Sequence, residues 1–213
     1  MQVETIERVG LQSLWLLEPR IAELLARLSG RGYITARVRP RALGGYDITF
    51  IEPPNVIAYR GSTYVMYDPS RRSLVVEGFS NNEVLAVFHE VEEILRDVGS
   101  DPKKGVLLYE LQVKALARGN RPTEVVKTSD IIGIDLLAVP MAFVSADGDP
   151  NSTRWFHLEL RPVWTSWSDE KTYYEVVVIY REKKERLIDA LKNIDKILRE
   201  IIQRIYSSLE INT

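Results

Sequence analysis

The chain contains one segment twice, and this internal repeat limits its fold more than any other feature of the sequence. Residues 83–98 (EVLAVFHEVEEILRDV) and 186–201 (RLIDALKNIDKILREI) align without a gap. Apolar residues coincide at Val84 and Leu187, Leu85 and Ile188, Phe88 and Leu191, Val91 and Ile194, Ile94 and Ile197, Leu95 and Leu198, and Val98 and Ile201. Both segments have the spacing of an amphipathic helix, and each follows a β-branched run, at 73–76 and 176–179. We therefore predict a duplicated unit with halves at 1–99 and 100–213.

Apolar periodicity predicts similar elements in the two halves. In the first half we expect helices over 4–17 and from Pro19 to Gly30, strands from Tyr33 and over 46–51, 63–68 and 73–78, and a helix over 82–98 capped by Ser80 or Asn81. In the second half we expect a helix from Ser100 to Gly119, strands over 123–128, 132–145, 154–163 and 172–181, and a helix over 183–209. The predicted fold class is α+β, in which each half is a helix, about four antiparallel strands and a helix, with the sheets packed against long helices.

Composition excludes several classes of function. The 213 residues include no cysteine and two histidines, which rules out disulfides, thiol nucleophiles, iron–sulfur clusters and Cys-ligated zinc. No nucleophile–base pair or phosphate-binding glycine loop is recognisable, so we expect no cofactor and no enzymatic activity. The net charge of −2 argues against a nucleic-acid binder, which usually carries a basic domain.

The sequence also indicates the location of the protein in the cell. No apolar run reaches the roughly 18–20 residues that a membrane span needs, and the N-terminus does not resemble a signal peptide. We therefore expect a cytoplasmic protein. The lack of cysteine and the many Glu, Arg and Ile residues are typical of thermophiles.

Two short segments of the first half resemble the TATA-box-binding-protein family, whose fold also uses an α-β-β-β-β-α unit twice. The segment 54–60 (PNVIAYR) is similar to that family's Pro-Gly-Leu-Ile-Tyr-Arg, and 75–83 (VVEGFSNNE) is similar to its strand, glycine and helix entry. The resemblance implies a saddle-shaped sheet that can bind DNA. Proteins of this family kink DNA with phenylalanine wedges. In this chain the segment before Val56 offers Pro53 and Pro54 but no Phe, and the candidate strand position holds Tyr67. None of the family's DNA-binding residues is therefore carried over.

His89 and Glu93 form the strongest candidate for a catalytic site. They lie four residues apart on one helix face, as the two histidines do in HExxH zinc sites, with His157 or an acid as the third ligand. The alternative is that Phe88 and Val91 face the core while His89, Glu92, Glu93 and Arg96 are solvated. The sequence favours this second interpretation.

Arg37, Arg39 and Arg41 alternate along one predicted strand and therefore share a face, which Arg31 and Arg60 would extend. Such a row can bind phosphates through bidentate hydrogen bonds, so nucleic acid is one candidate partner. The alternative is a solvated face that pairs with Asp47 and Glu52.

Aromatic residues gather in the predicted hairpin over 154–181. Alternation puts Phe156, Leu158 and Leu160 on one face, and Trp155, His157, Glu159 and Arg161 on the other. Trp164 and Trp167 follow closely in the sequence. A face with Trp, His and Arg can stack bases or bury against a protein, where Trp, Tyr and Arg concentrate. Pairing within the sheet is the alternative.

The last predicted helix carries more apolar surface than one contact face requires. Its side chains Ile201, Ile202, Ile205, Tyr206 and Leu209 would be buried between the halves or in a homo-oligomer. Taken together, the sequence favours a binding protein that engages a protein partner through its aromatic sheet face. Two alternatives are a saddle that binds nucleic acid through the Arg row, and a small-molecule pocket or metal-dependent hydrolase around His89.

Overall fold

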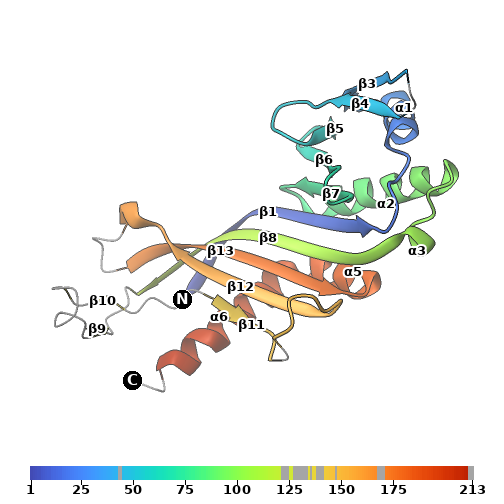
Figure 1. Ribbon diagram of the computed structural model, residues 1–213. Coiled ribbons are helices and arrows are strands. Elements are labelled where there is room, and N and C mark those ends of the chain that lie inside the picture. Colours follow the sequence, from blue (N-terminus) through green and yellow to red (C-terminus); the bar gives the residue numbers. More distant parts are fainter. Residues whose placement is uncertain are drawn as a thin grey trace.

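The computed structural model describes residues 1–42, 45–120, 125–126, 134, 136–137, 142–146, 148–166 and 171–210, and at 125–126, 136–137, 206 and 208–210 only the backbone. In these ranges the chain is an α+β protein built on a nine-stranded antiparallel sheet (Figure 1). The fold class and the antiparallel pairing agree with the prediction.

The sheet has the strand order β11-β12-β13-β8-β1-β7-β6-β5-β2. Its strands are β1 Gln2–Trp15, β2 Ile34–Thr35, β5 Val56–Arg60, β6 Thr63–Asp68, β7 Ser73–Gly78, β8 Val106–Asn120, β11 Ala142–Val144, β12 Trp155–Pro162 and β13 Lys171–Glu182. Separate hairpins are formed by β3 Arg37–Pro40 with β4 Tyr46–Thr49, and by β9 Val125–Val126 with β10 Leu136–Leu137. Because β1 and β8 pair from Gln2–Arg118 to Trp15–Val106, both halves of the chain share one continuous sheet.

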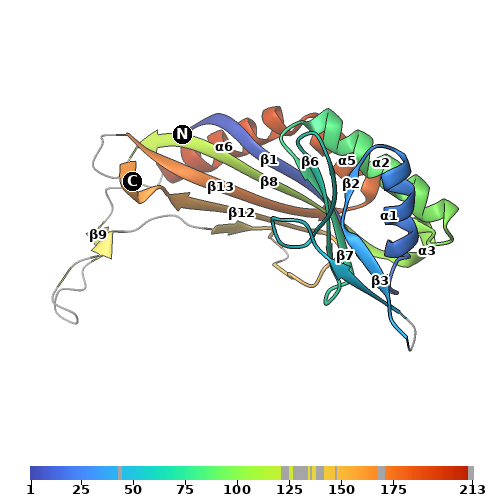
Figure 2. The ribbon, with the colours of Figure 1, turned by 90° about the horizontal axis from the view of Figure 1, so that it is seen from above.

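The helices cover one side of this sheet (Figure 2). The α-helices are α1 Ile21–Gly30, α2 Asn81–Asp97, α3 Pro102–Gly105, α5 Lys184–Lys192 and α6 Ile194–Glu210, and the short 3-10 helix η1 Trp164–Ser166 lies between β12 and β13 in the chain. In Figure 2, α2, α5 and α6 lie along the sheet on one side, and the other side carries no α-helix in the described ranges. A single apolar core, drawn from both halves, fills the space between helices and sheet. Among the described residues, no helix is both long and apolar enough to cross a membrane.

The helix predicted at the start of each half is wrong. Residues 4–17 belong mostly to β1, and residues 106–119 belong to β8, so that α3 is all that remains of the second helix. In β1, bulges at Val3–Thr5 and Ile6–Arg8 shift the alternation, which gives the apolar residues a helix-like spacing. From Leu111 to Ala117 of β8 the buried residues alternate strictly, at Leu111, Val113, Ala115 and Ala117.

Local signals were sufficient for several other elements. The predicted strands 63–68 and 73–78 are confirmed, as are the helices after Pro19 and after Ser80. Ser80 caps α2 by accepting a hydrogen bond from the Glu83 backbone N–H at 3.4 Å. Gly78 is needed before this cap because a Cβ there would lie 3.0 Å from Thr63 Oγ1 and 3.2 Å from the Ser62 carbonyl.

The second half departs more from the prediction. The strands expected over 154–163 and 172–181 are confirmed as β12 and β13, whereas the single helix expected over 183–209 is interrupted at Asn193, between α5 and α6. Of the strands expected over 123–128 and 132–145, only β9, β10 and β11 fall in the described ranges. The rest of these two strands lies outside the described residues.

Candidate binding surface on the open face of the sheet

The side of the sheet away from the helices, here called the open face, presents one row of residues that crosses all nine strands. The register places Ile34, Tyr59, Tyr64, Glu77, Gly10, Gln112, Ile179, His157 and Val144 next to one another in this order. The residues that follow or precede them on their strands, such as Val76, Leu111 and Leu158, are fully buried on the helix side. Since side chains alternate along a strand, the row points away from the helices.

An aromatic and cationic stack lies at the β12 end of the open face. The rings of Trp155 and His157 are stacked, with centroids 5.4 Å apart and planes inclined by 25°. The guanidinium carbon of Arg181 lies 5.1 Å from the Trp155 ring centroid. Trp155 Nε1 is buried and has no hydrogen-bond partner among the described residues. A buried unpaired donor costs stability, which suggests that this stack serves something besides folding.

Charged side chains on the open face pair with one another, three times between neighbouring strands and once within β12. Arg8 lies 2.9 Å from Glu77, Lys114 2.6 Å from Glu175, Arg161 2.7 Å from Glu159, and Arg181 2.7 Å from Glu110. Each of these basic groups thus has a carboxylate partner on the same face. Within each of these four pairs the two charges largely cancel, so the pairs offer little net potential to a polyanion.

In two of these pairs the pKa values are shifted towards the charged forms. The pKa of Glu159 lies below its ordinary value, chiefly because Arg161 donates a hydrogen bond to it. The pKa of Lys114 is raised, chiefly by its hydrogen bond to Glu175. Both shifts favour the charged forms, so the pairing persists throughout the neutral pH range.

The structure brings together part of the predicted aromatic surface. Trp155, His157 and Arg161 lie on the open face of β12, and Phe156, Leu158 and Leu160 lie on the helix side, as alternation predicted. Trp164 belongs to η1, outside the strands, and is 67% exposed. Trp167 lies outside the described residues.

The Arg row lies on the small β3–β4 hairpin, apart from the nine-stranded sheet. Arg37 and Arg39 are exposed, and Arg41 donates a hydrogen bond to Asp47 at 2.8 Å. The predicted extension of the row is wrong, because Arg31 and Arg60 bind Glu90 of α2 at 3.4 and 3.0 Å instead.

The two histidines cannot together form the metal site that was the less favoured interpretation of His89. His89 is exposed on α2, which covers the helix side, whereas His157 lies on the open face. Within the described ranges, no three His, Asp or Glu side chains are grouped to hold a metal ion.

The prediction that Glu92 is solvated is wrong. Its carboxylate is buried, accepts a hydrogen bond from the Tyr109 hydroxyl at 2.9 Å and lies 3.1 Å from Lys184 Nζ. Sequence reasoning missed it because its partners come from β8 and α5, far along the chain.

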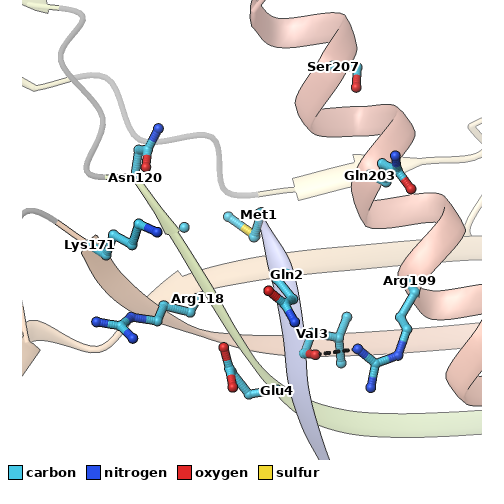
Figure 3. Close-up of a pocket in the computed structure, with 11 residues that line it drawn as sticks. Met1, Gln2, Val3, Glu4, Arg118, Asn120, Lys171, Arg199, Gln203 and Ser207 are labelled. Atoms are coloured by element: carbon cyan, nitrogen blue, oxygen red, sulfur yellow. Dashed lines mark hydrogen bonds between the residues drawn. The ribbon is translucent and has the colours of Figure 1, made fainter.

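A polar hollow of about 660 Å³ lies where β1 begins and β8 ends, beside α6 (Figure 3). Arg118, Lys171 and Arg199 line it, but their charges do not converge. In Figure 3 the guanidinium groups of Arg118 and Arg199 lie on opposite sides of β1. The Arg118 guanidinium lies 5.5 Å from the Tyr173 ring centroid, and Arg199 binds Asp195 at 2.9 Å and the Val3 carbonyl at 2.6 Å. The hollow is therefore a weaker candidate than the open face.

Sequence reasoning also missed the open-face residues Lys114, Glu110, Glu175 and Arg181. The first two were assigned to a helix, so their strand partners could not be recognised. The apolar residues at every second position, Leu111, Val113, Ala115 and Ala117, were the sequence signal that could have identified this strand. No family model matches this chain, and no curated protein matches it.

Proposed function

We propose that this chain is a non-enzymatic binding protein that engages a protein partner through the open face of its sheet. The observation that carries the proposal is the composition of this face, in which paired charges alternate with aromatic and aliphatic side chains. Trp155, Tyr173, Val177 and Ile179 lie between the ion pairs and are all partly exposed. Protein interfaces are enriched in Trp, Tyr and Arg, and need no net charge.

Charge distinguishes this proposal from nucleic-acid binding. Nucleic-acid affinity comes largely from basic groups that replace the counterions of phosphates. On the open face, Arg8, Lys114, Arg161 and Arg181 are already paired with carboxylates. A polyanion would have to break these pairs, whereas a protein could match them with its own polar rim.

A second candidate function rests on the β3–β4 hairpin. Arg37 and Arg39 project from β3 into solvent, which supports contact with phosphates there. Two exposed arginines supply only a small part of the electrostatic energy that such binding requires. We therefore rank nucleic-acid binding below a protein partner.

We also propose that halves 1–99 and 100–213 descend from one duplicated unit, as the resemblance to the TATA-box-binding-protein family implies. Two observations support this. Outward from the central pair, β1 is followed by β7 and β8 by β13, and these strands lead into α2 and α5. Aligned helix positions are also buried alike, at Val84 and Leu187, Phe88 and Leu191, Val91 and Ile194, and Leu95 and Leu198.

The proposal is tested by changing the open face without disturbing the core. An Ile179→Lys variant places a charge in the middle of the face, and Leu17→Lys places the same charge at a residue that is 77% exposed elsewhere. A protein partner isolated with the wild type and then purified should bind Leu17→Lys normally and Ile179→Lys at least tenfold more weakly. Equal affinity for the two variants would refute the proposal.

The same proteins should be titrated with a 30-base-pair DNA duplex and a single-stranded RNA at low salt. We expect no saturable binding. Salt-dependent binding that an Arg37→Ala/Arg39→Ala variant loses would instead support the second candidate.

A further inference from the structure

The helix side of the sheet contains an apolar groove of about 540 Å³, here called the α6 groove, between α5–α6 and the strands β12 and β13. Its walls include Phe156, Tyr180, Ile194, Ile197 and Ile201. The Phe156 and Tyr180 rings meet edge to face, with centroids 5.8 Å apart. Phe156, Tyr180, Ile197 and Ile201 are only partly buried, so the groove leaves apolar surface open to solvent.

On the other half of the molecule, a helix lies beside α2 over the outer strands of the sheet. α1 packs against α2 and against the outer strands β2 and β5. Ile94 of α2 is 1% exposed, whereas Ile197, with which it aligns in the repeated segment, is partly exposed beside the α6 groove. Among the described residues, no helix lies beside α5–α6 over β12 as α1 lies beside α2.

The residues of α1 define what such a position accepts. Ile21, Leu24, Leu25 and Leu28 are its buried side chains, at positions i, i+3, i+4 and i+7. This is the spacing with which amphipathic helices dock into hydrophobic grooves. The residues that line the α6 groove include Arg186 and Asp189, opposite charges about one turn apart, and Arg186 also lies 3.6 Å from Glu182. α1 carries Glu23 and Arg27 with a similar separation, so a helix of its kind matches these charges as well as the walls.

We propose that the α6 groove binds an amphipathic helix of another protein, with aliphatic residues at i, i+3, i+4 and i+7 and both an acidic and a basic residue beside them. The groove lies on the side of the sheet opposite the open face. This docking site is therefore independent of the function proposed above, and either proposal can fail alone.

The probe is a fluorescent peptide with the sequence of residues 19–31 (PRIAELLARLSGR), titrated with the full chain and followed by anisotropy. We expect saturable binding that Ile197→Glu weakens at least tenfold. Lys196→Glu places the same charge on the adjacent, 78% exposed side chain of α6 and should leave the affinity unchanged. A peptide with Leu24→Asp and Leu25→Asp should not bind. Absence of saturation at about 1 mM peptide, or equal affinity for the two protein variants, would overturn the proposal.

A second measurement covers the case in which Ile197→Glu unfolds the protein. The chain has no cysteine, so an Ile201→Cys variant carries a single thiol in the groove. We expect maleimide to label this thiol readily, and the peptide to slow the reaction at least tenfold. Slow labelling without peptide, at every protein concentration, would mean that the chain itself fills the groove. If labelling is slow but becomes faster on dilution, and light scattering shows a dimer, then a second copy of the chain fills the groove. Either result would overturn the proposal.

Discussion

The charged side chains on the two sides of the sheet differ in their surroundings and in the elements that they connect. On the helix side, Glu92 is buried and shared by Tyr109 and Lys184, so that α2 of the first half is bound to β8 and α5 of the second. On the open face, pairs such as Arg161–Glu159 are partly exposed and lie within one layer of side chains. A buried ion pair that loses one partner is strongly destabilised, whereas an exposed pair contributes little to stability. The helix side therefore joins the two halves, and the open face keeps polar groups available to a partner.

The largest expected effect concerns the Glu92 cluster. Glu92→Ala leaves Lys184 partly buried without its carboxylate, and we expect the free energy of unfolding to fall by about 3–5 kcal/mol. Urea denaturation measures this loss. Glu93→Ala, at the adjacent exposed position of α2, should cost less than about 0.5 kcal/mol. Similar losses in the two variants would contradict the structural role of Glu92.

Arg181 tests the most enclosed ion pair of the open face. Its partner Glu110 is buried, so Arg181→Ala removes a charge-assisted hydrogen bond from a carboxylate with little access to water. Glu110 also accepts a hydrogen bond from Gln112 at 2.7 Å, which Arg181→Ala leaves in place. We therefore expect a loss of about 1.5–3 kcal/mol in the same denaturation experiment, smaller than that of Glu92→Ala. A loss as large as that of Glu92→Ala would contradict the claim that ion pairs of the helix side contribute more to stability than those of the open face.

Glu90 gives stability a pH dependence. Burial alone would raise the pKa of Glu90, but the hydrogen bond from Tyr33 at 2.6 Å and the charges of Arg60 and Arg31 outweigh it and lower the pKa. A lowered carboxyl pKa stabilises the folded state above the ordinary value of about 4.3, and this contribution is lost as the pH falls through the folded pKa. The melting temperature should therefore fall less steeply between about pH 5 and 2 in Glu90→Gln than in the wild type. Parallel curves would contradict this role of Glu90.

The smallest effect is expected for the exposed pair of β12. Arg161→Ala should change the free energy of unfolding by less than about 1 kcal/mol. The same variant should also lower the affinity for the protein partner that we propose for the open face. A large loss of stability without loss of partner binding would make Arg161 a structural residue.

The sequence was informative where local signals decide the structure. Ser80 before an amphipathic stretch predicted α2, and the β-branched run at 73–76 predicted β7. Alternation along β12 also separated Trp155 and His157 from Leu158 correctly. These features depend on residues within a few positions of one another.

The features that the sequence did not predict depend on pairing between residues that are distant in the chain. β1 and β8 are strands because each pairs with the other, and the bulged spacing of β1 imitates a helix. From the sequence alone Glu92 is predicted to be solvated, because its partners Tyr109 and Lys184 come from other elements of the chain. Likewise, most of the charge pairs on the open face join two strands, as between Lys114 and Glu175. Local pattern alone could not have predicted these contacts.

The two histidines allow the most direct test of the central claim, because one lies on each side of the molecule. A photoreactive benzoylphenylalanine in place of His157 samples the open face, and the same residue in place of exposed His89 samples the outer surface of α2. On irradiation in the native cells, we expect a discrete protein adduct from position 157 and none of matching mass from position 89. The same adduct from both positions, an adduct from position 89 alone, or a nucleic-acid adduct from position 157 would contradict the account.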